Sequence, residues 1–595
     1  MKHPYLNFRT FCLISLLCCQ CLTVYSQDIL WEKSFGGVHA EYLFDAQPTA
    51  DYGFILAGSS LSDKSGNKEE NNQGDLDYWV WKMDENGNLD WQKSFGGNGF
   101  DLLQSIKNTN DGGFILAGTS SSNPLPVIAR NVANGEAQVG AKKDSCRGVT
   151  DFWVIKLNAA GEEQWQRTLG GSGQDEVLTV FQTRDGGFMV GGSSSSSPQP
   201  PPKEGEQATE GIVERTDLYG NNNSNINGNE KMGYAKPDLY GKSEKSRGNM
   251  DYWIVKLDKN GELQWQKTYG GEYADLLRSM EQTKDGGYIL GGYSNSPQSG
   301  EKADDIKGIG DYWILKIDAV GKIEWQQTYG GNGDNQLYAI HQTQDGGYIA
   351  GGNSNSTETL TAMGGRVSNG TDYWVIKMDE NGGIVWSKTY DFGKVDILTS
   401  LVENKDHTYL VGGYSSSPLA PEGGTENHKK VKVPEGINDY IALKIDDSGE
   451  VLWEQTVGSD GEDILKKMIE TRDGGYLMAG TSSGKASGDK KTAMGSNDFW
   501  VVKIKDKEKP LREKTTSIEA IPNPTASFTN IIIGYEFEKG TATVVDIAGR
   551  VLQQFPITSR TVPVDLSQYP DGVYIVNIKT KVQSDGVKII KSGGN

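Results

Sequence analysis

The chain after its N-terminus is almost free of cysteine, which excludes an internal disulfide framework. Four of the five cysteines (Cys12, Cys18, Cys19 and Cys21) lie in the first 26 residues, and only Cys146 follows. A single thiol cannot form a disulfide within the chain. We therefore expect packing alone to hold the fold together.

Long apolar runs are missing after the first 26 residues. Residues 1–26 contain Lys2 and Arg9, an apolar run from Phe11 to Val24, and the small residue Ser26 before the expected cut. A basic start followed by a short apolar core predicts a secretory signal peptide. No later run is long enough to span a bilayer, so we expect no transmembrane segment.

Positive charge is also scarce. The chain has 59 Lys and Arg against 79 Asp and Glu, a formal net charge of −20 that becomes −22 when the signal peptide removes Lys2 and Arg9. This balance argues against nucleic acid and against anionic membrane surfaces as partners. It fits a soluble extracellular protein and leaves room for divalent cations.

What the sequence has is a repeat, best seen at Asp251–Ser294. Four short segments rich in Tyr, Trp, Ile, Val and Thr are separated there by Lys-Asn-Gly, Gly-Gly and Asp-Gly-Gly, which predicts four β-strands joined by tight turns. Three marks each recur seven times. An aromatic-led strand starts at Asp77, Asp151, Asp251, Asp311, Asp372, Asp439 and Asp498; the next strand carries Trp31, Trp91, Trp165, Trp265, Trp325, Trp386 and Trp453; and a hairpin Asp stands at Asp51, Asp111, Asp185, Asp285, Asp345, Asp406 and Asp473.

The two ends of the repeat region complement each other. The first copy opens directly at its Trp strand, Ile29–Trp31, and the last copy ends on its aromatic-led strand, Asp498–Lys503. Together they make one complete unit, whereas a linear array would need polar caps. The pattern predicts an all-β fold, a seven-bladed β-propeller over residues 27–505 that is closed by its N-terminal and C-terminal strands. An open array of hairpins is the alternative.

Spacers of variable length separate the second and third strands of the copies. Because strands alternate in direction, all spacers and the loops between copies emerge on one face, and only tight hairpins emerge on the other. The longest spacer, residues 195–250, is rich in Ser, Pro, Asn and Gly, and we expect it to be disordered.

An acidic residue closes the Gly-rich loop between copies. It stands at Glu41, Asp101, Asp175, Asp275, Asn335, Asp396 and Asp463, with one amide among the seven. In a closed ring these residues, called the acidic ring below, would circle the mouth of the central channel. They are our candidate ligand-binding residues, and carboxylate oxygens also make calcium possible. The alternative is that each carboxylate accepts N–H bonds from its own loop or the next blade.

Catalysis has little support in the sequence. Four histidines follow the signal peptide at unrelated repeat positions, and no G-x-S-x-G, H-E-x-x-H or Cys/His pattern is present. Acid pairs recur in every copy, whereas chemistry needs one site with distinct environments. We therefore expect a binding or adhesion module without catalytic residues. The alternative is a polysaccharide-degrading enzyme with its site in the propeller funnel.

Residues 515–595, after a charged linker at 506–514, form a separate small domain. About seven short strands in about eighty residues predict a small Ig-like β-sandwich. This stretch carries a PNP opening, a D-x-x-G-R turn, a GVYIV segment and a KIIK close, with the key positions Pro522, Asn523, Pro524, Gly549, Arg550, Gly572, Tyr574, Lys588 and Lys591.

These motifs resemble the type A C-terminal sorting domain of the type IX secretion system of Bacteroidota, here following β-propeller repeats. The resemblance implies export across the outer membrane by that machinery and removal of the domain during secretion. The mature protein would then be extracellular or attached to the cell surface, where a glycan or a surface protein is the expected ligand.

Overall fold

The computed structural model describes residues 27–125, 140–198, 240–357, 370–416, 437–507 and 517–592. The predicted signal peptide, residues 199–239 of the long spacer and residues 508–514 of the linker lie outside the described residues. Every regular element in the described ranges is a β-strand, so the fold is all-β, as predicted. None of these residues belongs to a helix with the length and apolar character to cross a membrane.

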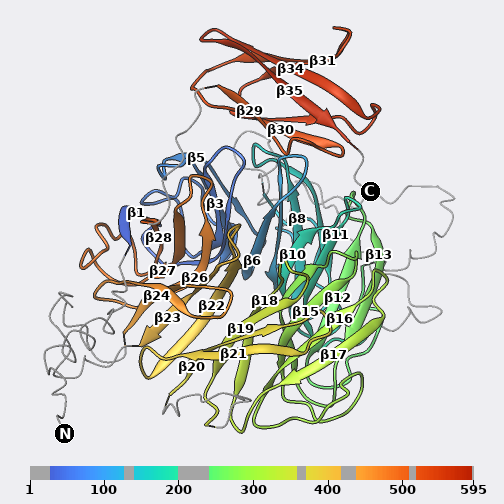
Figure 1. Cartoon of the computed structure of the whole chain (residues 1–595), viewed down its shortest axis with the longest axis vertical. Coiled ribbons are helices and arrows are strands. Elements are labelled where there is room, and N and C mark those ends of the chain that lie inside the picture. The colour runs from blue at the N-terminus through green and yellow to red at the C-terminus, as the bar shows by residue number, and fades with distance from the viewer. Residues whose placement is uncertain are drawn as a thin grey trace, which may run out of the picture.

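Seven four-stranded antiparallel sheets occupy the described part of residues 28–505, arranged as in a β-propeller (Figure 1). The first strands are β2 (Glu41–Pro48), β6 (Asp101–Asn108), β10 (Asp175–Gln182), β14 (Asp275–Gln282), β18 (Asn335–Gln342), β22 (Val395–Glu403) and β26 (Asp463–Glu470). The second strands are β3 (Phe54–Ser60), β7 (Phe114–Ser120), β11 (Phe188–Ser194), β15 (Tyr288–Ser294), β19 (Tyr348–Ser354), β23 (Tyr409–Ser416) and β27 (Tyr476–Ser482).

The third and fourth strands complete each sheet. The third strands, which begin on the aromatic-led segment, are β4 (Asp77–Met83), β8 (Asp151–Leu157), β12 (Asp251–Leu257), β16 (Asp311–Ile317), β20 (Asp372–Met378), β24 (Asn438–Ile445) and β28 (Asp498–Lys505). The fourth are β5 (Leu89–Phe95), β9 (Glu163–Leu169), β13 (Leu263–Tyr269), β17 (Ile323–Tyr329), β21 (Ile384–Tyr390), β25 (Val451–Val457) and, from the N-terminus, β1 (Asp28–Phe35).

The last sheet has the order β1-β28-β27-β26, so the N-terminal strand completes it. β1 pairs antiparallel with β28, from Asp28 opposite Lys505 to Phe35 opposite Phe499. The first strands of successive sheets contact each other, and β26 of the last sheet contacts β2 of the first. The sheet order is the one that the repeat pattern predicts.

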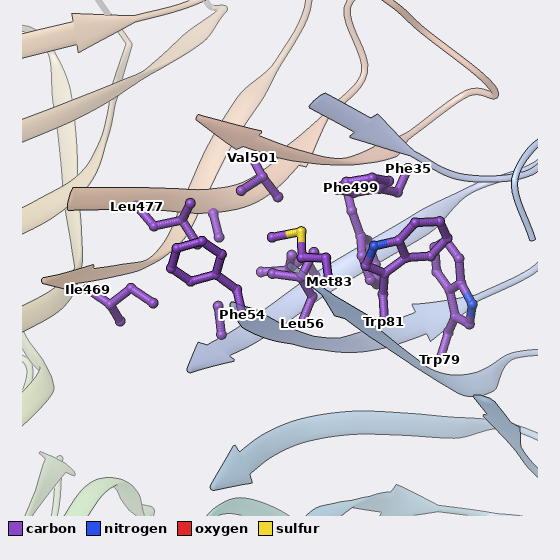
Figure 2. Packing of buried hydrophobic residues seen from close by; sticks show 13 residues of the cluster. Phe35, Phe54, Leu56, Trp79, Trp81, Met83, Ile469, Leu477, Phe499 and Val501 are labelled. Atoms are coloured by element: carbon purple, nitrogen blue, oxygen red, sulfur yellow. The ribbon is translucent and has the colours of Figure 1, made fainter. Parts of the chain in front are cut away.

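Apolar residues from the first and last sheets pack together where the two ends of the repeat region meet. Figure 2 shows Phe35, Phe499, Leu477 and Ile469 lying against Phe54, Leu56, Trp79 and Trp81 of the first sheet. The rings of Phe35 and Trp81 have centroids 4.5 Å apart. These side chains are fully or almost fully buried. The apolar surface that they remove from water joins the two ends of the repeat region into one core.

The C-terminal residues form two packed sheets. One has the order β29 (Ile518–Ile521), β30 (Phe528–Ile533), β33 (Thr561–Asp565); the other has the order β32 (Val551–Ile557), β31 (Gly540–Asp546), β34 (Gly572–Thr580), β35 (Ser584–Lys591). Ile531 and Val564 of the first sheet share a buried core with Val544, Val576 and Ile589 of the second.

Candidate functional site

The acidic ring lies at the start of the seven first strands, and every one of its side chains is 0% exposed. Its six carboxylates accept hydrogen bonds from their own loops, whereas the Asn335 amide donates to Gly310 O at 3.0 Å. Gly37 N–H donates to Glu41 at 3.0 Å, and Gly271 N–H donates to Asp275 at 2.7 Å. A serine that follows the second strand donates as well, for example Ser296 to Asp275 at 2.9 Å. Each carboxylate therefore holds the loop before the first strand against the end of the second strand of the same sheet.

Burial leaves these carboxyl groups harder to ionise. It raises the pKa of Asp463 and of Asp396 to about 6, and the Asp372 charge adds to the effect on Asp396. The aspartate that begins an aromatic-led strand is affected in the same way. Burial raises the pKa of Asp77 to about 7, and the nearby Asp101 charge raises it further. Desolvation outweighs the hydrogen bonds at these positions.

Five spacers each insert a lysine beside this acid network. The lysines are 2% exposed or less: Lys68, Lys142, Lys242, Lys302 and Lys490. Lys490 Nζ lies 3.0 Å from Asp498 Oδ2, and Lys242 lies close enough for the charges of Asp175 and Asp251 to favour its ionised form. Burial is the larger influence on Lys242 and lowers its pKa to about 8. The sequence did not predict these lysines, because they occur in polar loops.

In one repeat, Asp391 adds a third carboxylate beside Asp372 and Asp396. Asp391 stands where other copies have glycine, and ligand atoms of Asp372, Asp391 and Asp396 lie within 4.8 Å of one another. In another copy the position of Asp391 is occupied by Gly270, where a Cβ would lie 2.1 Å from the Asp251 carboxylate. A side chain at this loop position therefore lies next to the aspartate that begins the third strand. Asp391 is exposed while Asp396 is buried. Oxygen ligands in this arrangement suit calcium, whose binding stays a prediction.

Each of the seven first strands also contains a β-bulge that the sequence did not reveal. The register shifts by one residue at the same point in every strand, between Leu277 and Ser279 in β14, for example. The extra residues, called the bulge residues below, are Phe44, Gln104, Leu178, Arg278, Tyr338, Thr399 and Lys466. All are half-buried, and all seven differ in type. Bulges often redirect a side chain beside a functional site.

The sorting-motif residues belong to the C-terminal sheets. Pro522 and Pro524 are exposed, and Asn523 between them bonds to β35 by donating to Lys588 O at 2.7 Å and accepting from Ile590 N–H at 2.9 Å. Gly549 has φ +80°, as the turn requires, and Arg550 Nε donates to Asp546 at 2.7 Å.

The rest of the motif lies on β34 and β35. Tyr574 is buried, and its hydroxyl donates to Pro570 O. Lys591 is 9% exposed and donates to Tyr569 O, whereas Gly572 and Lys588 are exposed. The motif therefore combines turn and packing positions with an exposed face.

The C-terminal sheets contact the hairpin face of the repeat region. Tyr52 Oη donates to Glu519 at 3.2 Å, and Thr561 Oγ1 donates to Asp51 at 3.2 Å. Tyr52 holds φ +67° where most copies have glycine, and the Arg472 guanidinium lies 5.8 Å from its ring centroid. The contact leaves the opposite face, which carries the spacers, away from the C-terminal domain.

Comparison with known proteins identifies the C-terminal part. Residues 519–592 match the family described as the secretion system C-terminal sorting domain. No curated protein matches the chain.

Several solved structures are similar at low identity. PorZ, described as an essential bacterial surface component of the type-IX secretion system of Porphyromonas gingivalis, is 11% identical, covering 97% of this chain and 88% of that chain, with TM-score 0.21. Sqt1 from Chaetomium thermophilum is 10% identical over 80% and 98% of the two chains, with TM-score 0.35. A Synechocystis apocarotenoid oxygenase mutant is 10% identical over 82% and 97%, with TM-score 0.31. The family match over residues 519–592 shows that the chain carries a type IX C-terminal sorting domain, which directs export across the outer membrane to the cell surface or extracellular space.

Proposed function

We propose that the mature chain is a β-propeller binding or adhesion module for a glycan or surface protein, delivered outside the cell by its sorting domain. The signal peptide is residues 1–26, the propeller residues 27–505, the linker 506–514 and the Ig-like sorting domain 515–595. The type IX machinery handles the chain through the last of these.

The propeller in this proposal is a closed ring of seven blades. Its support is the sheet order β1-β28-β27-β26, together with the contact between β26 and β2. In such a ring the first strand of each sheet is innermost, and the bulge residues surround the central axis. The acidic ring then lies nearer the spacer-bearing face, because it begins each inner strand.

One observation carries the binding role: the bulge residues differ in every repeat, whereas the residue before each bulge is leucine in six repeats and valine in one. Scaffold residues repeat because each sheet meets the same packing problem. Leu43, Leu103 and Leu277, for instance, precede their bulges and are all 0% exposed. A ligand without sevenfold symmetry needs different contacts from different strands. The bulge residues meet that need, whereas a buried acid recurs in six of the seven repeats, with Asn335 in the other.

A glycan array of the mature chain, run with calcium and with a chelator, tests this function. Binding to a glycan class supports the module, and dependence on calcium implicates Asp391 and the acidic ring. Retention of the bound glycan over hours is expected, whereas its progressive loss would favour a polysaccharide-degrading enzyme. Absence of binding both to the array and to surface proteins would refute the proposal.

A further inference from the structure

The bulge residues include two cations that lack an anionic partner. Neither Arg278 nor Lys466 makes an ion pair or side-chain hydrogen bond with any residue that the structure describes. The Arg278 Nε–H is buried and unpartnered within the described ranges. This is unusual in a chain of net charge −20, because a buried donor without a partner costs free energy.

Aromatic bulge residues from neighbouring strands position both cations. The Arg278 guanidinium lies 5.7 Å from the ring centroid of Tyr338, and Lys466 Nζ lies 5.6 Å from that of Phe44. A cation–π contact orients a cation without neutralising it. The two pairs come from β14 with β18 and from β26 with β2.

The charge of Arg278 acts on Lys466 although their strands are not neighbours. Burial lowers the pKa of Lys466, and the positive charge of Arg278 lowers it further. In a ring of seven inner strands, β14 and β26 lie on opposite sides of the axis. Because the Arg278 charge still acts on Lys466, we infer that both side chains extend toward this axis.

Asp45, a carboxylate next to the bulge of β2, is already engaged. Asp45 accepts from Lys107 Nζ at 2.8 Å, and the positive charges of Lys107 and Lys467 hold its pKa low against the opposing effect of burial. Lys467 follows the bulge directly, and burial lowers its pKa to about 8. Asp45 is thus paired with Lys107 rather than with either bulge cation.

We propose that the propeller axis binds an acidic sugar of the uronate type, with its carboxylate held between Arg278 and Lys466. Charge-assisted hydrogen bonds to a carboxylate are among the stronger polar contacts in proteins. The remaining bulge residues supply what a sugar ring needs: Gln104, Thr399 and Tyr338 carry polar groups for hydroxyls, and Leu178 and Phe44 offer apolar surface. This inference deepens the proposed binding function and rests on it.

The repeat itself supplies the test variants. Glutamine occupies the bulge of β6, so Arg278→Gln and Lys466→Gln place at the bulge a residue that the fold already accepts there. Arg184→Gln is the matched control, because Arg184 is an exposed cation on the hairpin face, where it donates to Lys284 O at 2.7 Å.

Isothermal titration of the full mature chain with glucuronate, glucose and acetate tests the proposal. We expect saturable glucuronate binding that weakens about tenfold or more in either axis variant and is unchanged in Arg184→Gln. Glucose and acetate should each bind much more weakly. No glucuronate binding, equal binding by the axis variants, or equal binding of acetate or glucose would overturn it.

Thermal melting separates a ligand role from a structural one. Two facing cations without an anion destabilise the ligand-free fold, so each axis variant should melt at the same temperature as the unmodified chain or higher. A clear loss of stability in both variants would assign the cations to the scaffold and overturn the proposal. A glycan array that shows neutral glycans bound would still leave the wider binding function standing.

Discussion

A tyrosine hydroxyl ties each of five sheets to the next, and its removal should have a measurable cost. Tyr252 is 0% exposed, and its hydroxyl donates to the Trp313 carbonyl of the following sheet at 2.9 Å. The two rings also pack, with centroids 4.9 Å apart. Gly292 makes the approach possible, because a Cβ there would lie 2.7 Å from the hydroxyl.

Tyr252→Phe removes one buried hydrogen bond and keeps the ring. We expect the free energy of unfolding to fall by about 1–2 kcal/mol, since a net hydrogen bond contributes about 1 kcal/mol and the carbonyl loses a partner. Tyr373→Phe should cost less, because its hydroxyl lies 3.5 Å from Ile441 O. Phe152 shows that phenylalanine fits this position, since its ring packs on Trp253 at 4.6 Å.

Urea unfolding of the mature chain measures the effect through the transition midpoint, with the slope of the transition unchanged. Tyr273→Phe is the control, because Tyr273 is 46% exposed and should change stability by less than about 0.5 kcal/mol. If Tyr252→Phe costs no more than the control, the hydroxyl bonds do not stabilise the contacts between sheets.

Three further predictions concern charge and the long spacer. Folding raises the pKa of Asp77 to about 7 and of Asp463 to about 6, so the folded state holds these protons more tightly and stability should fall as pH rises from about 4 to 8. Asp285, whose folded pKa is about 2, adds stability that is lost below about pH 4. The melting temperature should therefore be highest near pH 4–5, and a maximum at pH 8 would contradict this. Asp391→Gly should raise the melting temperature in calcium-free buffer, because it removes one of three neighbouring negative charges. Calcium should raise the melting temperature of the unmodified chain more than that of the variant. Equal calcium responses in the two melts would argue against a calcium site there. Deleting residues 199–239 should leave the melting temperature within a few degrees, because Lys242 still donates to Ser196 O; a large drop would show that the segment packs.

The repeat pattern made the sheets predictable. Each strand type has its own mark, and the split of one unit between Ile29–Trp31 and Asp498–Lys503 predicts the pairing of β1 with β28 that the structure contains. Strand composition and Gly-rich turns act locally, so they can be recognised without knowing the fold.

The candidate site was less accessible to sequence analysis. The position of the acidic ring at the start of each first strand is predictable, but its complete burial depends on serines and lysines distant in sequence, such as Ser296 and Lys302. The bulges are invisible because an extra residue interrupts alternation without changing composition. Arg278 and Lys466 therefore read as ordinary polar positions until the register is known.

Ring closure by the N-terminal strand is the claim on which the axis and its ligand depend, and hydrogen exchange tests it directly. In a closed ring each sheet is held from both sides, so deleting residues 27–37 should accelerate amide exchange in β14 and β15, far from the deletion, as well as in β28. A chain lacking residues 199–239 serves as the control. Exchange that rises only in β26–β28, with β14 and β15 fully protected, would show an open array of independent sheets and contradict the account.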